Sequence, residues 1–213
     1  MAYTYDYPHP AVTVDIVIFT VEAGDLKVLL VKRAQEPYRD RWALPGGFIR
    51  LDESLRRAAW RELKEETGVA AGFLEQIGAF GRPDRDPRER VISVAYFALL
   101  PRDRLTIQPA SDAKDARLVN VDELPELAFD HARMLRYARE RLKDKAGDPS
   151  IVLQLMPEEF TLSELQRVFE LILGCALDKR NFRKRADLLT RIEPTGETRQ
   201  DGPHRPAKLY RIR

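Results

Sequence analysis

Apolar residues follow two different periods along the first two-thirds of the chain. Runs rich in β-branched and aromatic residues predict strands, and they cover residues 11–20, 26–32 and 91–100. Stretches with apolar residues every three or four positions predict helices, and they cover residues 55–67 and 130–145. The expected boundary residues are Gly24-Asp25 in a hairpin turn, Gly68 at the end of the first helix and Asp130 as the N-cap of the second.

The last third of the chain begins after a polar segment. Residues 143–150 (KDKAGDPS) contain Gly and Pro, which predicts a helix end followed by an interdomain linker. Thr161 and Glu164 have the spacing of a capping box at the start of a helix, and Phe160 is placed to pack on Leu165.

A second helix of this region is predicted to start near Asp178. Its expected inner face consists of Phe182, Ala186 and Leu189. Two short strands follow at residues 191–198 and 207–213, with a loop of Gly, Pro, His and Arg between them. Helix, helix and basic hairpin is the order of a winged helix-turn-helix. We therefore predict two domains, with boundaries at residues 1–147 and 148–213.

The composition sets the class of protein. The chain has 213 residues, of which 44% are hydrophobic, and this is enough apolar material for a packed core. No run approaches the roughly 18 apolar residues of a membrane span, and residues 1–10 lack the features of a secretory signal. The sequence contains one cysteine, Cys175, so an intrachain disulfide is excluded. These features predict a cytoplasmic protein with no membrane partner.

The charge is unevenly distributed between the two predicted domains. The whole chain carries a formal net charge of +2. From residue 174 onward there are 11 basic and 5 acidic residues, a net charge of +6, which leaves −4 for residues 1–173. An acidic body with a basic end suggests two modules with different partners. A basic surface that is merely solvated remains the alternative.

The segment from Gly47 to Val69 carries its charges at a defined spacing. It reads as Gly, five residues, Glu, seven residues, Arg-Glu-Leu, one residue, Glu-Glu, one residue, Gly-Val. On a helix, Glu62 and Glu66 lie one turn apart on one exposed face, with Glu65 beside them. Three close carboxylates are tolerated when a hard cation lies between them, and Mg²⁺ prefers oxygen ligands. The buried stripe on the opposite face consists of Leu55, Ala58, Ala59 and Leu63.

This spacing resembles the Nudix box at every defined position. The resemblance implies a Nudix α/β/α sandwich with a mixed sheet, which binds Mg²⁺ (or Mn²⁺) and a nucleoside diphosphate linked to another group. It implies a catalytic set of Glu53, Arg61 and Glu62, and metal ligands at Glu62, Glu65, Glu66 and the backbone of Gly46. The general base of this family varies, and the candidates here are Glu89, Asp112, Asp115 and Glu123, with no choice among them.

Other residues of the first domain are candidates for ligand binding. Trp42 could stack on a base, although a buried anchor explains it equally well. The charged loop of residues 82–90 could hold a phosphate through its arginines, or it could be an ordinary solvated hairpin. The full ligand-binding set is Trp42, Arg50, Arg82, Arg85 and Arg88. His131, at a helix start, is interpreted as a residue of the cap region.

The basic residues of the second domain are candidates for DNA binding. With Phe182 turned inward, the outer face of the predicted second helix suits a major groove, and the arginines of the hairpin suit phosphates or a minor groove. A basic oligomerisation domain is the alternative. The DNA-binding set is Lys179, Arg180, Asn181, Arg183, Lys184, Arg199 and Arg205.

Nearly the whole chain resembles the NrtR-type transcriptional regulators, in which a Nudix domain precedes a winged helix. The sequence segments that carry the resemblance are PAVTVDIVIFT, WALPGGF, AFDHARML, FTLSELQRVFE, LDKRNF and RPAKLYR. The resemblance implies a homodimer that binds operator DNA and senses ADP-ribose, in a regulator of NAD metabolism. Many such regulators have an eroded Nudix box, whereas this box is intact. Two alternatives therefore stay open, a Mg²⁺-dependent ADP-ribose pyrophosphatase and a regulator that senses another sugar or nucleotide.

Overall fold

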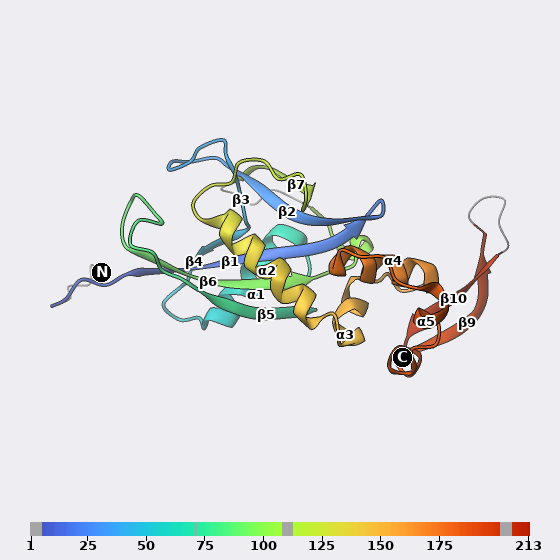
Figure 1. The fold of residues 1–213 in the computed structure, drawn as a ribbon. Coiled ribbons are helices and arrows are strands. Elements are labelled where there is room, and N and C mark those ends of the chain that lie inside the picture. Colours follow the sequence, from blue (N-terminus) through green and yellow to red (C-terminus); the bar gives the residue numbers. More distant parts are fainter. Residues whose placement is uncertain (1–5, 71, 108–112, 201–205) are drawn as a thin grey trace.

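A mixed sheet of seven strands forms the centre of the first domain (Figure 1). The computed structural model describes residues 6–70, 72–107, 113–200 and 206–213. The principal strand order is β3-β2-β1-β6-β5, with β4 paired to β1 and β7 to β2. Strands β1 and β6 are parallel, and the other pairs are antiparallel. The strands are β1 (Ala11–Glu22), β2 (Asp25–Arg33), β3 (Trp42–Ala43), β4 (Gly46–Phe48), β5 (Phe73–Phe80), β6 (Val91–Leu99) and β7 (Ala113–Asn120).

The hairpin turn between β1 and β2 lies one residue earlier than predicted. Its two central residues are Ala23 and Gly24, both with positive φ, at 53° and 81°. Asp25 instead pairs with Glu22 as the first residue of β2. Two left-handed residues in a row match the twist of the flanking strands, which explains the choice of this register.

Two helices cover opposite faces of the sheet, which confirms the sandwich (Figure 1). Helix α1 (Leu55–Thr67) buries Ala58, Ala59 and Leu63 in the same cluster as Ile16 and Ile18. Helix α2 (His131–Lys145) buries Met134, Leu135 and Ala138 with Val17 and Phe19. Because side chains alternate along a strand, β1 supplies apolar residues to both layers. A short 3₁₀ turn, η1 (Arg102–Arg104), follows β6.

The second domain combines short helices with a three-stranded antiparallel sheet of order β8-β10-β9, as expected for a winged helix. Thr161 caps α4 through its hydroxyl, which accepts from the Glu164 N–H at 3.1 Å, and Glu164 Oε2 accepts from the Thr161 N–H at 2.7 Å. The predicted capping box is therefore confirmed. The elements are α3 (Pro149–Val152), η2 (Leu153–Leu155), β8 (Phe160–Thr161), α4 (Leu162–Leu173), α5 (Lys179–Phe182), α6 (Ala186–Leu189), β9 (Ile192–Arg199) and β10 (Ala207–Ile212).

The prediction of one continuous helix from residue 178 was wrong. Helices α5 and α6 are separated by a turn in which the Lys184 and Arg185 N–H groups bond to carbonyls three residues back. These tighter bonds rotate the chain relative to a continuous α-helix. As a result Leu188 is buried, whereas Leu189 is 40% exposed. Phe182 is buried as predicted and lies edge-on to Phe169, with ring centroids 5.4 Å apart.

The junction between the domains is shorter and more buried than the predicted linker. Helix α2 ends at Lys145, and α3 begins at Pro149. Ala146 is buried, and Asp148 pairs with Arg191 at 3.3 Å. A single hydrophobic cluster extends from the sheet through α2 into α4 and β9. The winged helix is therefore packed against the first domain. Within the described part of the chain, no helix is long and apolar enough to cross a membrane.

Candidate functional site

Arg61 organises the carboxylates at the start of α1. Its guanidinium donates to both Glu53 oxygens, at 2.7 and 3.1 Å, and to Glu62 Oε1 at 2.5 Å. It also lies 3.6 Å from Glu65 and donates to the carbonyl of Phe48 at 3.2 Å. The hydrogen bonds from Arg61 lower the pKa of Glu53 to about 2, and the same bonds raise the pKa of Arg61. This arginine therefore joins the loop after β4 to the helix.

The glutamates of α1 are less exposed than predicted. Glu62 and Glu66 are 8% and 3% exposed, which corrects the expectation of an exposed face, whereas the Glu65 side chain is 45% exposed. A Cβ at residue 47 would lie 2.4 Å from Glu62 Oε1, and one at residue 46 would lie 2.2 Å from the Val14 carbonyl oxygen. The two glycines are therefore required for β4 to approach both α1 and β1.

The donor set fits a hard divalent cation in its chemistry. Glu62, Glu65 and Glu66 offer carboxylate oxygens on neighbouring turns, and Gly46 adds a backbone carbonyl nearby. In the residues that the structure describes, no three acidic, His or Cys side chains converge as a metal site would require. The guanidinium of Arg61 lies among these carboxylates and pairs with Glu53, Glu62 and Glu65. A cation held by Glu62 and Glu65 would share both carboxylates with Arg61.

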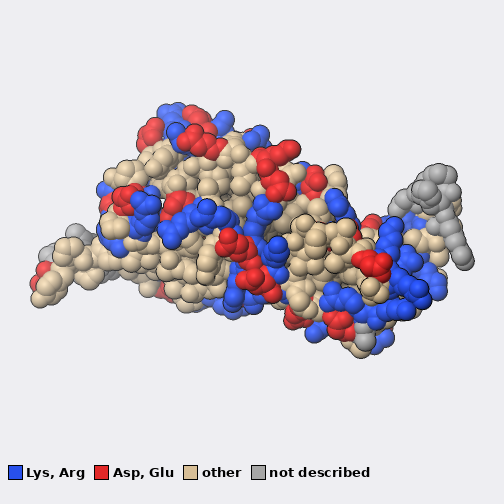
Figure 2. Space-filling view, in the orientation of Figure 1, with Lys and Arg blue, Asp and Glu red and all other residues tan. Residues whose placement is uncertain are grey.

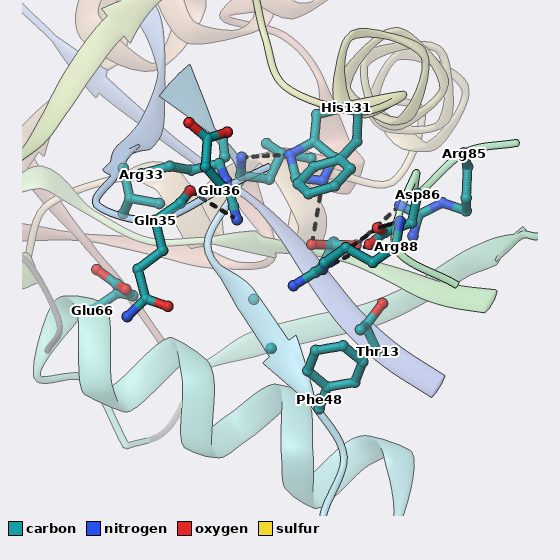
Figure 3. A pocket seen from close by; sticks show the side chains of 17 residues that line it. Thr13, Arg33, Gln35, Glu36, Phe48, Glu66, Arg85, Asp86, Arg88 and His131 are labelled. Atoms are coloured by element: carbon teal, nitrogen blue, oxygen red, sulfur yellow. Dashed lines mark hydrogen bonds and ion pairs between the residues drawn. The ribbon is translucent and has the colours of Figure 1, made fainter. Parts of the chain in front are cut away.

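A cavity of about 260 Å³ opens between β1, β2, β4 and the start of α2 (Figure 3). Four acidic side chains and three arginines line it, together with apolar residues. The lining residues are Thr13, Asp15, Val31, Arg33, Gln35, Glu36, Ala43, Leu44, Gly46, Gly47, Phe48, Glu66, Arg85, Asp86, Arg88, Phe129 and His131.

The inner end of the cavity holds a buried polar cluster. Arg85 donates to Asp130 Oδ1 at 2.9 and 3.1 Å and lies 3.6 Å from Asp15. Ser93 donates a hydrogen bond to Asp15. His131 Nδ1 accepts from the Leu44 N–H at 2.9 Å. Burial lowers the pKa of His131, so its ring is neutral at pH 7.

Asp130 therefore does not act as predicted at the start of α2. It occupies the N-cap position, but its side chain makes no capping hydrogen bond. The carboxylate instead accepts from Arg85. A charge-assisted pair with an arginine is stronger than a neutral hydrogen bond, and it links the loop before β6 to α2.

The outer end of the cavity pairs an arginine with aromatic rings. Arg88 makes two hydrogen bonds to Asp86, at 2.7 and 3.0 Å. Burial opposes ionisation of Asp86, but the hydrogen bonds from the side chain and N–H of Arg88 outweigh it and keep its pKa below the ordinary value. The Arg88 guanidinium lies 5.6 Å from the centre of the Phe48 ring and 6.0 Å from that of Phe129.

The structure gathers some predicted ligand-binding residues and not others. Arg85 and Arg88 line the cavity. Trp42 lies under the Arg117 guanidinium at 4.0 Å, Arg50 lies 4.0 Å from Glu65, and Arg82 pairs with Asp84. None of these three lines the cavity.

The candidates for a general base also lie away from the cavity. Glu89, Asp115 and Glu123 are exposed and do not line it. Asp112 lies outside the described residues.

Sequence reasoning missed two residues at the centre of the cavity. Asp15 is an isolated acidic residue within an apolar strand. A carboxylate at such a position indicates a buried polar group with a functional role. His131 was interpreted as a residue of the cap region, yet it is 3% exposed and reaches the cavity. The aromatic pair Phe48 and Phe129 has no signal in the sequence, because only the fold brings β4 beside the loop before α2.

The basic residues of the second domain form an exposed surface. Lys179, Arg180, Asn181, Arg183 and Lys184 are all exposed, as predicted. Figure 2 shows basic side chains gathered at the end of the molecule that carries α5, β9 and β10. Arg199 is partly exposed and pairs with Glu164, while Arg205 lies outside the described residues. We call the surface of residues 179–184 the basic face.

The fold and the site define a Nudix domain joined to a winged-helix domain. Two family models match the chain, the NUDIX domain at residues 9–138 and the NrtR DNA-binding winged helix domain at residues 152–212. The ADPR-responsive transcriptional repressor NtrR of Acinetobacter baylyi is 41% identical over 97% of this chain and 84% of its own length. The chain belongs to the NrtR family of Nudix-related transcriptional regulators.

Solved structures of this family have the same architecture. Shewanella oneidensis NrtR complexed with a 27mer DNA is 38% identical, has a TM-score of 0.82, and matches 95% of this chain and 93% of its own. The NUDIX domain of the same protein complexed with ADP ribose is 40% identical, with a TM-score of 0.58, and matches 65% of this chain and 94% of its own.

Proposed function

We propose that this protein is a transcriptional repressor that binds operator DNA through its winged helix and ADP-ribose in the cavity of its Nudix domain. One observation carries the proposal: both domains match NrtR in a single superposition with a TM-score of 0.82, and that structure was solved on DNA. The proposed domain boundaries are residues 1–147 and 148–213, and the proposed location is the cytoplasm.

The basic face supports the DNA-binding part of the proposal. Phosphate contacts supply most of the affinity of such proteins, and lysine and arginine supply the contacts. Residues 179–184 are exposed except for Phe182, whose ring is buried and anchors α5 to α4. Asn181 offers an amide for base edges, and Arg199 and Arg205 are the candidate contacts of the wing.

The lining of the cavity supports the ligand-binding part. A nucleoside diphosphate with a second sugar needs a stacking surface, cations for the diphosphate, and hydrogen-bonding groups for the hydroxyls. Phe48 and Phe129 supply aromatic faces, and Arg33 and Arg88 supply cations. Arg50, Arg82 and Trp42 remain candidates only if their side chains turn toward a bound ligand.

Helix α2 supplies a physical connection between the two sites. Its first residue, His131, lines the cavity, and its buried face shares a hydrophobic cluster with α4 of the second domain. A rigid helix that contacts both domains can carry a displacement from the cavity to the second domain. A ligand that binds the two arrangements of α2 with different affinity therefore changes the affinity for DNA.

The active form is proposed to be a homodimer with one basic face per subunit. A two-fold symmetric protein recognises a site whose two halves are related by symmetry. Sedimentation equilibrium tests the subunit number, with a mass near twice the 24.5 kDa of the chain expected.

The direct test of the proposed function uses the intact protein in two measurements. Purified protein should enrich a near-palindromic sequence from a pool of random duplexes, and calorimetry without Mg²⁺ should detect stoichiometric binding of ADP-ribose. Failure to enrich any sequence would refute the role on DNA, and absence of ADP-ribose binding would refute the choice of ligand.

Hydrolysis of ADP-ribose is a second candidate function. It is favoured by the intact network of Glu53, Arg61 and Glu62. When bound, Mg²⁺ (or Mn²⁺) would supply Lewis-acid stabilisation of charge on the diphosphate, and Glu62, Glu65, Glu66 and the Gly46 carbonyl would hold it. Arg61 would keep the loop with Glu53 against α1. Incubation with ADP-ribose and Mg²⁺ should yield AMP and ribose 5-phosphate by chromatography, and recovery of intact ADP-ribose would exclude this activity.

A further inference from the structure

The inner end of the cavity carries polar groups whose role is not assigned by the function proposed above. Asp15, Arg85 and His131 meet there and all line the cavity, although each is more than nine-tenths buried. They come from β1, the loop before β6 and the first turn of α2. Burial of three such groups is costly unless partners compensate it.

In this cluster the Nε2 donor of His131 and a carboxylate oxygen of Asp15 lie next to each other at the wall of the cavity. His131 Nδ1 accepts from the Leu44 N–H, so the neutral ring carries its proton on Nε2. His131 Nε2 lies 3.5 Å from Asp15 Oδ1, and Arg85 Nη2 lies 3.6 Å from Asp15 Oδ2. Both distances exceed the roughly 2.7–3.2 Å of a good hydrogen bond. An additional group can therefore bond to Asp15 and His131 together.

A hydroxyl is the group that matches this arrangement. It donates to a carboxylate and accepts from an N–H, and the Asp15–His131 pair offers both. A phosphate accepts hydrogen bonds only. It would also meet the carboxylate of Asp15, while the charge of Arg85 is already paired with Asp130. The inner end of the cavity therefore favours sugar hydroxyls over phosphate.

The outer end of the cavity suits the remaining parts of a nucleotide. The side chain of Arg88 is 42% exposed and can meet a diphosphate. Phe48 is 44% exposed and offers a ring face to a base. With the base and diphosphate there, the part of the ligand that reaches the inner end is the second sugar.

We propose that Asp15 and His131 bind the hydroxyls of the second ribose, the one not attached to adenine, and thereby select ADP-ribose over other ADP derivatives. This inference rests on the proposed ADP-ribose function. It assigns Asp15 and His131 as specificity-determining residues, held in place by Ser93 and Leu44 from behind.

The test compares two ligands of equal charge by calorimetry in EDTA. One is ADP-ribose, and the other is the β-propyl ester of ADP, which lacks the second sugar. Wild-type protein should bind ADP-ribose about tenfold or more tightly than the ester, because a hydroxyl bonded to a charged group contributes on that scale. In Asp15→Asn, ADP-ribose affinity should fall about tenfold or more, while ester affinity should change less than about threefold.

Asp103→Asn is the matched control. It makes the same chemical change at an exposed position that does not line the cavity, so this variant should keep the preference for ADP-ribose. If Asp15→Asn loses affinity for both ligands by the same factor, Asp15 contributes to stability alone and the inference is overturned. If circular dichroism shows that Asp15→Asn does not fold, the wild-type protein still tests the inference. Equal affinities of the wild-type protein for ADP-ribose and the ester would overturn it. Wild-type protein that binds neither ligand would instead refute the proposed function itself.

Discussion

At the scale of single residues, the Glu53–Arg61 pair makes a prediction about pH. Arg61 lowers the pKa of Glu53 from 4.5 to about 2, so the pair contributes stability above about pH 4.5 and loses it as the pH falls through about 2. Glu53→Gln should therefore lower Tm at pH 7, and the difference from wild type should shrink between these limits. Thermal melts by circular dichroism measure this, with Glu158→Gln at an exposed position as the control. A difference that is constant with pH would contradict the assignment.

Glu65 makes a second prediction at this scale, which concerns hydrolysis. If the wild type cleaves ADP-ribose, Glu65→Gln should reduce kcat by about a hundredfold or more, because the charge of a metal ligand is removed. The fold should be kept, since the Glu65 side chain is 45% exposed. The assay is Mg²⁺-dependent formation of AMP, with Glu158→Gln as the control for removal of an exposed carboxylate. Unchanged turnover in Glu65→Gln would remove Glu65 from the metal ligands.

The residues of the Nudix box could be predicted from the sequence because they lie within one helix and its preceding loop. Glu53, Arg61 and Glu62 meet as expected. Their burial could not be predicted, since it depends on β4, whose glycines let the strand approach Glu62. Asp15 and His131 are more than a hundred residues apart in the chain, and only the packing of α2 on β1 brings them together.

At the scale of the elements, the basic face of α5 and the turn after it makes a prediction about DNA affinity. Lys184→Ala should weaken operator binding and lower the slope of log K against log salt by about 1 for each DNA phosphate that the variant no longer neutralises. ADP-ribose binding should be unchanged. Arg57→Ala, at an exposed position on α1, removes the same charge far from the basic face and should leave the slope unaltered. The measurement is fluorescence anisotropy between low and moderate salt, and identical slopes for both variants would place the DNA surface elsewhere.

Elements with a strong apolar period could be predicted, whereas the shortest strands and the eight-residue strands β5 and β7 were missed. Helices α1 and α2 and strands β1, β2 and β6 match their patterns closely. Strands β3 and β4 have two and three residues, which is too short for a period to appear. The break between α5 and α6 was missed because Lys184 and Arg185 are good helix formers, and tertiary burial of Leu188 overrides that preference.

At the scale of the whole molecule, the junction limits how the winged helices of a dimer can be placed. Only residues 146–148 separate α2 from α3, and Asp148 is tied to Arg191. The spacing of the two basic faces should therefore be fixed by the Nudix dimer, and half-sites should be separated by whole turns of DNA. Insertion of half a turn, about 5 base pairs, between half-sites should abolish binding, and insertion of a full turn should restore part of it. Binding that is indifferent to spacing would contradict a rigid junction.

The central claim is that ADP-ribose and operator DNA bind to one protein with opposing effects. Operator affinity should be measured by fluorescence anisotropy with and without saturating ADP-ribose, in EDTA so that the ligand is not consumed. Coupling of the usual size predicts that ADP-ribose weakens operator binding about 5- to 150-fold, and that operator DNA weakens ADP-ribose binding by the same factor. Equal operator affinities in both conditions, with ADP-ribose binding verified by calorimetry, would show that ADP-ribose is not the effector and would contradict the account.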